Sequence, residues 1–430
     1  MQTATHSNRQ STPDRGILAW MCVLIAVNQL GFGAVIPVLP LYAKSFDVSQ
    51  TAIGATVAIY GVARVFLGIP TGQLADLVGR RNTLAVGGVV TVIGNLWCAV
   101  ATSYVELLVA RLVAGAGAGV VLTAGLIVLA DITTTANRGR TLSIYQGVFL
   151  FAVGIGPLPG GFLAEKFSLA APFLVYGVAG ALVTAVAWFG VRETRGLHDA
   201  TTEADATRKP PVSLRTQLRL LLDNAGFQLV CLTGLVGALA RTGGLFSIVP
   251  VIARDRLSLS ATEIGAGFAL GSILGLFVTY PAGMLVDRLG RKAVIVPATF
   301  LIGVSMLCFS FAPDYAWFLT ACAVWGMAIT ASASAPAAYA ADAAPRGMNA
   351  AAMGSYRMLS DVGYVAGPVL LGWLGDTGGL DLPLWSAAAA LFVMAALFGW
   401  YAPETARNPQ PDARTRTVER AREPSESRTS

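Results

Sequence analysis

The chain has 430 residues, of which 55% are hydrophobic and only 13% are charged, and its mean hydropathy is +0.64. A soluble globular protein carries about 25% charged residues, so this composition excludes an ordinary soluble enzyme and a disordered chain and indicates a protein embedded in lipid. The net charge of +6 does not indicate nucleic-acid binding, because basic residues of membrane proteins gather in cytoplasmic loops.

Twelve apolar stretches are long enough to cross a bilayer, and they must cross it as helices because hydrocarbon offers the backbone no hydrogen-bonding partner. The first stretch is too long for a signal peptide and contains Pro37 and Pro40. The predicted fold class is an all-α membrane protein with twelve transmembrane helices. We expect the spans at residues 17–42, 52–74, 83–102, 106–130, 141–164, 170–191, 225–253, 262–283, 294–312, 315–340, 350–374 and 384–402.

The Lys and Arg residues assign the loops to the two sides of the membrane. With both termini in the cytoplasm, 22 of the 30 basic residues lie in cytoplasmic segments and four in outer loops. We therefore predict a multi-pass protein of the cell membrane with a cytoplasmic tail at 1–16, a polar linker at 192–224 and a disordered tail at 404–430. Within the linker, residues 214–222 predict an amphipathic helix on the inner face.

The residue types that bind metals or form disulfides show no useful spacing. The two histidines lie in polar stretches, and the cysteines lie inside apolar runs, where we expect them to act as small core residues. The sequence therefore predicts no metal site, no cofactor and no enzymatic activity. The cysteines are Cys22, Cys98, Cys231, Cys308 and Cys322.

Residues 211 positions apart match repeatedly along the chain. This ungapped offset predicts two parallel six-helix bundles, at 17–191 and 225–403, with a substrate site between them near the membrane midplane. The matched pairs include Gly54 with Gly265, Pro70 with Pro281, Asp76 with Asp287, Arg80 with Arg291, Asp131 with Asp342, Tyr145 with Tyr356, Pro157 with Pro368 and Glu193 with Glu404.

One loop pattern occurs twice, at residues 72–81 and 283–292. Its glycines permit a tight turn and close helix approach, its carboxylate can cap a helix N-terminus, and its basic residues can bind phosphates or carboxylates. The pattern resembles the G-x-L-a-D-r-x-G-R-[RK] signature of the major facilitator superfamily, and the resemblance covers residues 17–403. It implies a gate that locks the outward-facing state; the alternative is a turn that is merely positive on the inside. The gate residues are Gly72, Asp76, Gly79, Arg80, Arg81, Gly283, Asp287, Gly290, Arg291 and Lys292.

The fourth span contains Arg111 followed by Gly115, Gly117 and Gly119. No strand precedes these glycines and no Lys-Ser/Thr follows them, so they indicate close helix packing rather than nucleotide binding. The stretch resembles the R-x-x-x-G-x-G-a motif of the same family, which implies a role for Arg111 in proton coupling.

The fifth span carries glycines and prolines that predict a bend into which neighbouring helices pack closely. Its G-P-x-x-G-G core resembles the motif of the family's twelve-helix drug:proton antiporters, which implies export rather than uptake. The first span contains Gly31, Gly33, Pro37 and Pro40 and in this resembles the same group. It has Asn28 and Gln29 where many multidrug members place a carboxylate, and we expect these two amides in the substrate cavity. The residues of the fifth-span motif are Gly147, Gly154, Gly156, Pro157, Gly160 and Gly161.

Five charged residues remain inside the predicted spans: Arg64, Arg111, Arg241, Arg357 and Asp361. Each costs about 2.5–3.5 kcal/mol at the bilayer centre, so we expect each to have a partner, water or a function. Asp361, with Arg357 one turn before it, is the predicted proton-coupling carboxylate; the alternative is a static ion pair that braces the helix. Arg64 and Arg241 predict an electropositive cavity suited to anionic, zwitterionic or neutral polar substrates, unless they bond backbone carbonyls instead.

These features together predict a secondary transporter that exports a small amphiphilic drug or metabolite in exchange for protons. The proton gradient is the expected energy source, because the chain has no nucleotide-binding domain. The expected partners are a small-molecule substrate and the lipid bilayer, with no nucleic acid and no nucleotide, and monomers are usual for the family. The main alternative is proton-coupled uptake of a small metabolite or organic anion; a remote one is a non-transporting membrane sensor.

Overall fold

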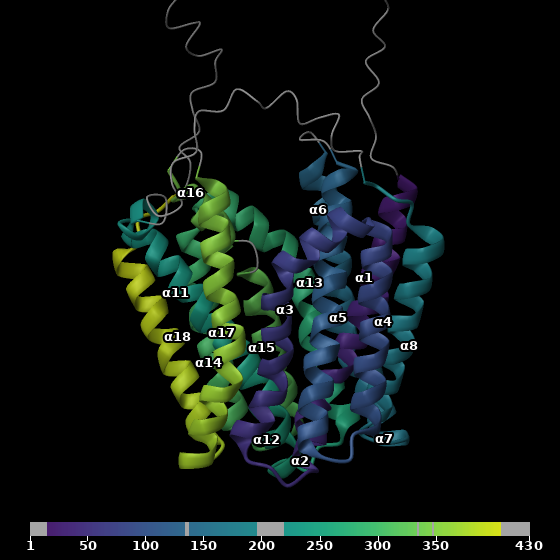
Figure 1. Ribbon diagram of the computed structural model, residues 1–430. Helices are drawn as coiled ribbons and strands as arrows, with labels where there is room; N and C mark the ends of the chain where they lie inside the picture. Colours follow the sequence, from purple (N-terminus) through teal and green to yellow (C-terminus); the bar gives the residue numbers. More distant parts are fainter. Residues whose placement is uncertain (1–14, 134–136, 196–218, 333–334, 346–347, 406–430) are drawn as a thin grey trace, which may run out of the picture.

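The computed structural model describes residues 15–133, 137–195, 219–332, 335–345 and 348–405, and in these ranges the chain forms twelve helical spans apolar and long enough to cross a membrane. The predicted fold class is therefore confirmed (Figure 1). The first six spans comprise α1 (Arg15–Val35) with α2 (Leu39–Lys44), α3 (Gln50–Val78), α4 (Arg80–Val100), α5 (Tyr104–Asp131), α6 (Arg138–Ile155) with α7 (Pro157–Lys166), and α8 (Ala171–Ala185) with η1 (Val186–Gly190). The other six comprise α11 (Ala225–Leu239) with η3 (Ala240–Ile248) and α12 (Val249–Asp255), α13 (Ala261–Leu289), α14 (Lys292–Ser310), α15 (Tyr315–Ala331) with α16 (Ala335–Asp342), α17 (Asn349–Gly378) and α18 (Asp381–Tyr401).

Several predicted spans are broken where the backbone cannot continue a regular helix. The first is interrupted between α1 and α2 at Pro37, which lacks the N–H that a helix interior needs. The fifth breaks at Gly156, directly before Pro157. The seventh contains the π-helix η3, a wider turn that is common at functional sites. The bend predicted for the fifth span is thus present, whereas the break in the seventh was not expected.

Three predictions about the chain's interior and tails have different outcomes. Cys98, Cys231 and Cys322 are buried, as predicted for small core residues, whereas Cys22 and Cys308 are partly buried. The predicted amphipathic helix at 214–222 lies outside the described residues except for its last four positions, which are helical. The tails before Arg15 and after Thr405 also lie outside them.

The helices form two groups that correspond to the two sequence repeats. In Figure 1, α1, α4, α5, α6 and α8 occupy the right of the view, α11, α14, α17 and α18 occupy the left, and α3 runs between them. We call the end of the bundle that carries α2, α7 and α12, at the bottom of Figure 1, the α2–α12 face. The other end, where α1 begins and α18 ends, is the terminal face.

The two halves meet closely toward the α2–α12 face. A Cβ built on Gly54 of α3 would lie 2.0 Å from the carbonyl oxygen of Pro368 in α17, and one on Gly265 of α13 would lie 2.1 Å from that of Pro157. These two contacts are related by the 211-residue offset, so the repeat packs against itself symmetrically. The buried apolar cluster at this end also draws side chains such as Val38 and Ile248 from both halves.

Toward the terminal face the same helices stand apart. A Cβ built on any of five glycines would meet nothing within 4 Å, and these glycines lie on the helices that touch the other half elsewhere. The bundle is therefore closed at the α2–α12 face and open toward the terminal face. The five are Gly68 and Gly72 of α3, Gly147 of α6, Gly283 of α13 and Gly354 of α17.

Candidate functional site: the cavity between the halves

A cavity of about 630 Å³ lies between α3 and α5 of the first half and α17 of the second. Its volume falls within the range of about 300–1,000 Å³ that holds drug-sized ligands. Most of the wall is apolar, so charged side chains on it are conspicuous. The lining residues are Gly61, Val62, Arg64, Val65, Phe66, Gly68, Gly119, Leu122, Thr123, Leu126, Gly354, Arg357, Met358, Asp361, Val362, Tyr364, Val365 and Ala366.

Three of the five predicted intramembrane charges line this cavity: Arg64, Arg357 and Asp361. The guanidinium of Arg64 lies over the ring of Tyr364, 5.8 Å from its centroid, so this contact joins the two halves. Tyr364 had no predicted role, because a tyrosine in an apolar helix carries no sequence signal of its own.

Asp361 and Arg357 share one face of α17, as their spacing predicts, but they do not form an ion pair. Within the described ranges, no side chain pairs with the Asp361 carboxylate, and neither Arg357 nor Arg64 donates a hydrogen bond. The described residues therefore show no static ion pair bracing this helix in this conformation. Asp361 remains the predicted proton carrier.

Arg241 lies on the π-helix η3, beside the cavity but not on its lining. Its Nε atom is buried without a hydrogen-bond partner. It is within electrostatic range of Tyr364, Arg64 and Asp361, so its positive charge acts on the same site. The prediction that it contacts substrate stays a prediction.

Arg111 is separated from the cavity by packing. Its side chain is 2% exposed, its guanidinium lies 4.4 Å from the ring centroid of Tyr60, and its Nε donates to the Thr56 carbonyl oxygen at 3.3 Å. The Tyr60 hydroxyl is 3.2 Å from that of Tyr176, and Arg111 Nη1 has no partner. No membrane carboxylate balances this charge among the described residues, so the aromatic ring stabilises it.

Asn28 and Gln29 are buried in α1 and bonded to each other, with Asn28 Nδ2 donating to Gln29 Oε1 at 2.9 Å. Neither is on the lining of the cavity. The structure thus brings together Arg64, Arg357 and Asp361 and leaves these two amides behind the wall.

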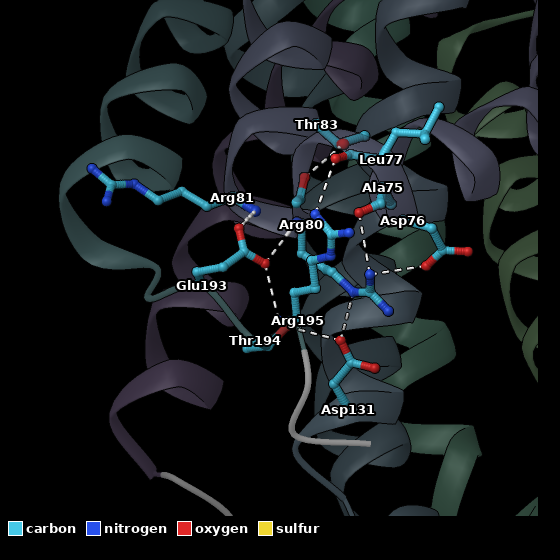
Figure 2. Close-up of polar contacts among 11 residues, drawn as sticks. Ala75, Asp76, Leu77, Arg80, Arg81, Thr83, Asp131, Glu193, Thr194 and Arg195 are labelled. Atoms are coloured by element: carbon cyan, nitrogen blue, oxygen red, sulfur yellow. Dashed lines mark hydrogen bonds and ion pairs between the residues drawn. The ribbon is translucent and has the colours of Figure 1, made fainter. Parts of the chain in front are cut away.

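The first loop motif forms a dense polar network at the terminal face (Figure 2). The side chain of Arg80 donates to Asp131 at 2.8 Å, to Asp76 at 2.9 Å and to the Ala75 carbonyl oxygen at 3.1 Å. Asp131 is only 4% exposed, whereas Asp76 is 72% exposed. Asp76 therefore lies at the edge of the network rather than at its centre.

The helix cap predicted for the motif's carboxylate comes from another residue, Glu193, in the segment after η1. Its carboxylate accepts hydrogen bonds from the backbone N–H groups of Arg80 and Arg81 at the start of α4, at 2.9 and 3.2 Å (Figure 2). Burial opposes ionisation of Glu193, but the bonds from the Arg80, Arg195 and Arg81 amides outweigh it and hold the pKa below its usual value of 4.5. Gly79 has φ +94°, and a Cβ there would collide with Glu193, so the turn requires glycine.

The second loop motif repeats this design. Arg291 Nε pairs with Asp342 at 3.0 Å, the Arg291 amide donates to Glu404 at 2.9 Å, and Gly290 has φ +95°. Lys292 Nζ donates to the Ala402 carbonyl oxygen. The side chain of Asp287 lies outside the described residues. The matched pairs at offset 211 had singled out the aspartates and glutamates of both networks, but not their roles.

Glycines Gly72 and Gly283, predicted to allow close helix approach, meet no neighbour in this conformation. The fifth-span motif does pack closely: a Cβ on Gly156 would lie 2.7 Å from Gly33 Cα, and one on Gly160 would lie 2.0 Å from the Ala34 carbonyl oxygen. Gly154 and Gly161 face α13 of the other half in the same way, against Ser272 and Ala261, whereas Gly147 faces open space.

At the α2–α12 face, carboxylates of each half cap helices of the other. Asp376 at the end of α17 accepts from the Gln50 and Thr51 amides at the start of α3, at 2.7 and 2.9 Å. Glu165 at the end of α7 is hydrogen-bonded to Ser260 and Thr262 at the start of α13.

These two caps, in which a carboxylate of one half caps a helix of the other (the crossed caps), obey the 211-residue repeat, and so does a nearby ion pair. Glu165 and Asp376 stand at equivalent positions, and so do the two helix starts that they cap. Lys44 pairs with Asp255, 211 residues later, across the pseudo-two-fold axis. None of these contacts was predicted.

Comparison with known proteins agrees with this architecture. The profile of the Major Facilitator Superfamily matches residues 21–360 and 230–427. An uncharacterized MFS-type transporter of Methanocaldococcus jannaschii is 22% identical over 353 residues, covering 82% of this chain and 89% of its own. The quinolone resistance protein NorA of Staphylococcus aureus is 23% identical over 287 residues, covering 66% and 71%.

A solved structure shows the same fold. The crystal structure of a bacterial homologue of the human lysosomal transporter Spinster, inward-facing and unoccupied, superposes with a TM-score of 0.71 at 15% identity, covering 89% of this chain and 95% of that one. The family profile spans most of the chain, and the two-fold repeat, the doubled loop motif and a cavity between the halves are all present. The chain belongs to the Major Facilitator Superfamily.

Proposed function

We propose that this protein exports a small amphiphilic compound across the cell membrane in exchange for protons. The observation that carries the proposal is the unpaired carboxylate of Asp361 in the wall of a cavity of about 630 Å³ between the two halves. A carboxyl group without a fixed partner can exchange its proton with water, and it releases that proton to water when a cation binds beside it. Access would alternate as the two halves rock around the cavity.

Three further observations support this direction of transport. The glycine- and proline-rich packing of α6 and α7 matches the motif of drug:proton antiporters. One relative is named for quinolone resistance. With the terminal face in the cytoplasm, as the basic loops predict, the cavity opens inward, where an exporter collects its substrate. On this proposal the protein works as a monomer and needs no nucleotide, metal or other cofactor.

The second candidate is proton-coupled uptake of an organic anion. The observation that favours it is the excess of positive charge at the cavity: Arg64 and Arg357 line it together with the single carboxylate of Asp361, and Arg241 lies within electrostatic range of that carboxylate. An anion and a proton neutralise opposite charges there, so they would bind together rather than in competition.

A transport assay with Asp361→Asn tests the proposal. Purified protein in liposomes, under an imposed pH gradient, should accumulate substrate uphill and move protons in the opposite direction. The variant should retain counterflow, which needs only alternating access, and should lose uphill transport. Full uphill transport by the variant would contradict the role of Asp361, and protons moving in the same direction as substrate would favour uptake.

A further inference from the structure

The wall of the cavity carries both signs of charge in unpaired form. Arg64 approaches from α3 of the first half, and Asp361 and Arg357 from α17 of the second. Over the described part of the chain, the two guanidiniums donate no hydrogen bond and the carboxylate accepts none. A site whose charged donors and acceptor have no hydrogen-bonding partner is prepared for a ligand that supplies those partners.

A simple cation fits this wall poorly. Asp361 would attract it, but Arg64 and Arg357 line the same cavity and Arg241 lies within electrostatic range of Asp361. Three positive charges near one negative charge leave a net repulsion for a ligand that is only positive.

A simple anion fits the charges but not the exchange of substrate for protons. The arginines would bind it, and protonation of Asp361 would remove the one repulsive charge, so anion and proton would bind cooperatively. Exchange requires the reverse: the substrate must compete with the proton for Asp361. Such a substrate needs a positive group of its own.

We infer that the cavity selects a zwitterionic amphiphile, with its ammonium group at Asp361, its carboxylate at Arg64 and its apolar body along α5 and α17. This inference rests on the proposed proton exchange and names the substrate class of the same site. Arg64 binds a carboxylate through two parallel N–H donors, a geometry that a lysine cannot match. Because Arg64 and Asp361 belong to different halves, the ligand would touch both of the parts that move.

The rest of the cavity is consistent with this assignment. Leu122 and Leu126 of α5 and Met358 and Val362 of α17 form apolar walls beside the charged groups. A body of one or two aromatic rings would bury against them. Tyr364, under the Arg64 guanidinium, would hold this donor in place while it binds.

Three probes with one skeleton separate the possibilities. They are 4-biphenylalanine, a zwitterion; 2-(4-biphenylyl)ethylamine, a cation; and 3-(4-biphenylyl)propanoic acid, an anion. Binding to the full-length protein in lipid nanodiscs is measured by calorimetry between pH 5 and 8. We expect the zwitterion to bind at least about ten-fold tighter than either of the other two, and more weakly as the pH falls, because protons compete for Asp361.

Variants assign the two charged ends of the ligand. Arg64→Gln should remove the preference for the zwitterion over the amine, and Asp361→Asn its preference over the acid. Arg64→Lys keeps the positive charge and the fold but not the two parallel N–H donors of the guanidinium, and it should retain only part of the affinity for the zwitterion. Arg254→Gln, on α12 away from the cavity, is the matched control and should bind all three probes as the unaltered protein does.

Each contrary result has a distinct meaning. If the amine binds most tightly, the inference of a zwitterionic substrate is overturned, while exchange of a cationic substrate for protons still stands. If the acid binds most tightly, and more tightly as the pH falls, the inference is overturned in favour of uptake of an anion together with protons. If no probe binds at millimolar concentration, the inference is also overturned, while the liposome assay still decides the proposed function.

Discussion

The two ends of the helix bundle are held by different kinds of contact. At the α2–α12 face, Asp376 and Glu165 each cap a helix of the other half, and Lys44 pairs with Asp255 across the axis. At the terminal face, the networks around Arg80 and Arg291 each stay inside one half, as far as the described residues show. One end therefore keeps the halves together, and the other keeps each half rigid while the two stand apart.

This difference explains how one fold can open at one end without unfolding. Contacts between the halves must break when the α2–α12 face opens, so they should be numerous but individually weak: a cap, an exposed ion pair, close glycine contacts. Contacts inside a half must survive the movement, and the Arg80–Asp131 pair is accordingly buried.

Filling the close contact between the halves should have the strongest consequence. Gly54→Val places side-chain atoms against the Pro368 carbonyl oxygen, at a position where even a Cβ would be 2.0 Å away. Overpacking of this kind costs about 2 kcal/mol, so the closed α2–α12 face should become about 30-fold less populated. Distances between spin labels at Ser168 and Pro313, exposed in different halves at this face, should lengthen.

The control is Gly72→Val on the same helix. Nothing lies within 4 Å of a Cβ at Gly72 in this conformation, so the label distances should not change. An equal lengthening in both variants would show that the comparison between the two ends is wrong.

The next largest effect concerns rigidity within one half. Arg80→Gln leaves the carboxylate of Asp131, which is 4% exposed, with the Thr194 hydroxyl but without its cationic partner, and should cost about 1.5 kcal/mol of stability. The equivalent Arg291→Gln should cost about 1 kcal/mol or less, because Asp342 is 36% exposed. Thermal unfolding of the two detergent-solubilised variants measures the difference, and equal losses would contradict it.

A smaller effect is expected at the crossed caps. Asp376→Asn removes the negative charge at the start of α3 and should reduce the closed population by about five-fold, the usual effect of losing a helix cap. Glu165→Gln should act in the same direction at α13, and the double variant should combine the two losses. The same pair of spin labels reports both, and a shift toward the closed state would refute the capping role.

The smallest effect concerns pH and the cap within the first half. The pKa of Glu193 is lowered in the folded protein, so its contribution to stability is present above the usual value of 4.5 and is lost as the pH falls through the lowered pKa. The thermal midpoint of Glu193→Gln should lie below that of the unaltered protein at pH 7, and the gap should close on acidification. A gap independent of pH would mean that the charge of Glu193 does not stabilise the cap.

Much of the fold and part of the site could be predicted. The doubled loop pattern located Arg80 and Arg291. The free-energy cost of placing a charge inside the bilayer singled out Arg64, Arg357 and Asp361, three residues that line one cavity. Arg111 belongs to the same set by sequence, yet it is stacked on Tyr60 behind the wall. Hydropathy shows that a charge is in the membrane, but not which way its helix is turned.

Hydropathy and the constant offset of 211 residues were enough to predict the number of spans and their two-fold repeat, because both are read from neighbouring residues and from spacing along the chain. Which end is closed, which charges share the cavity and which carboxylate caps which helix depend on how the helices pack. These contacts join residues far apart along the chain: Asp376 and Gln50 are separated by 326 residues, and Arg64 and Tyr364 lie in different halves. Such contacts exist only once the helices have taken their rotation and spacing in the packed bundle.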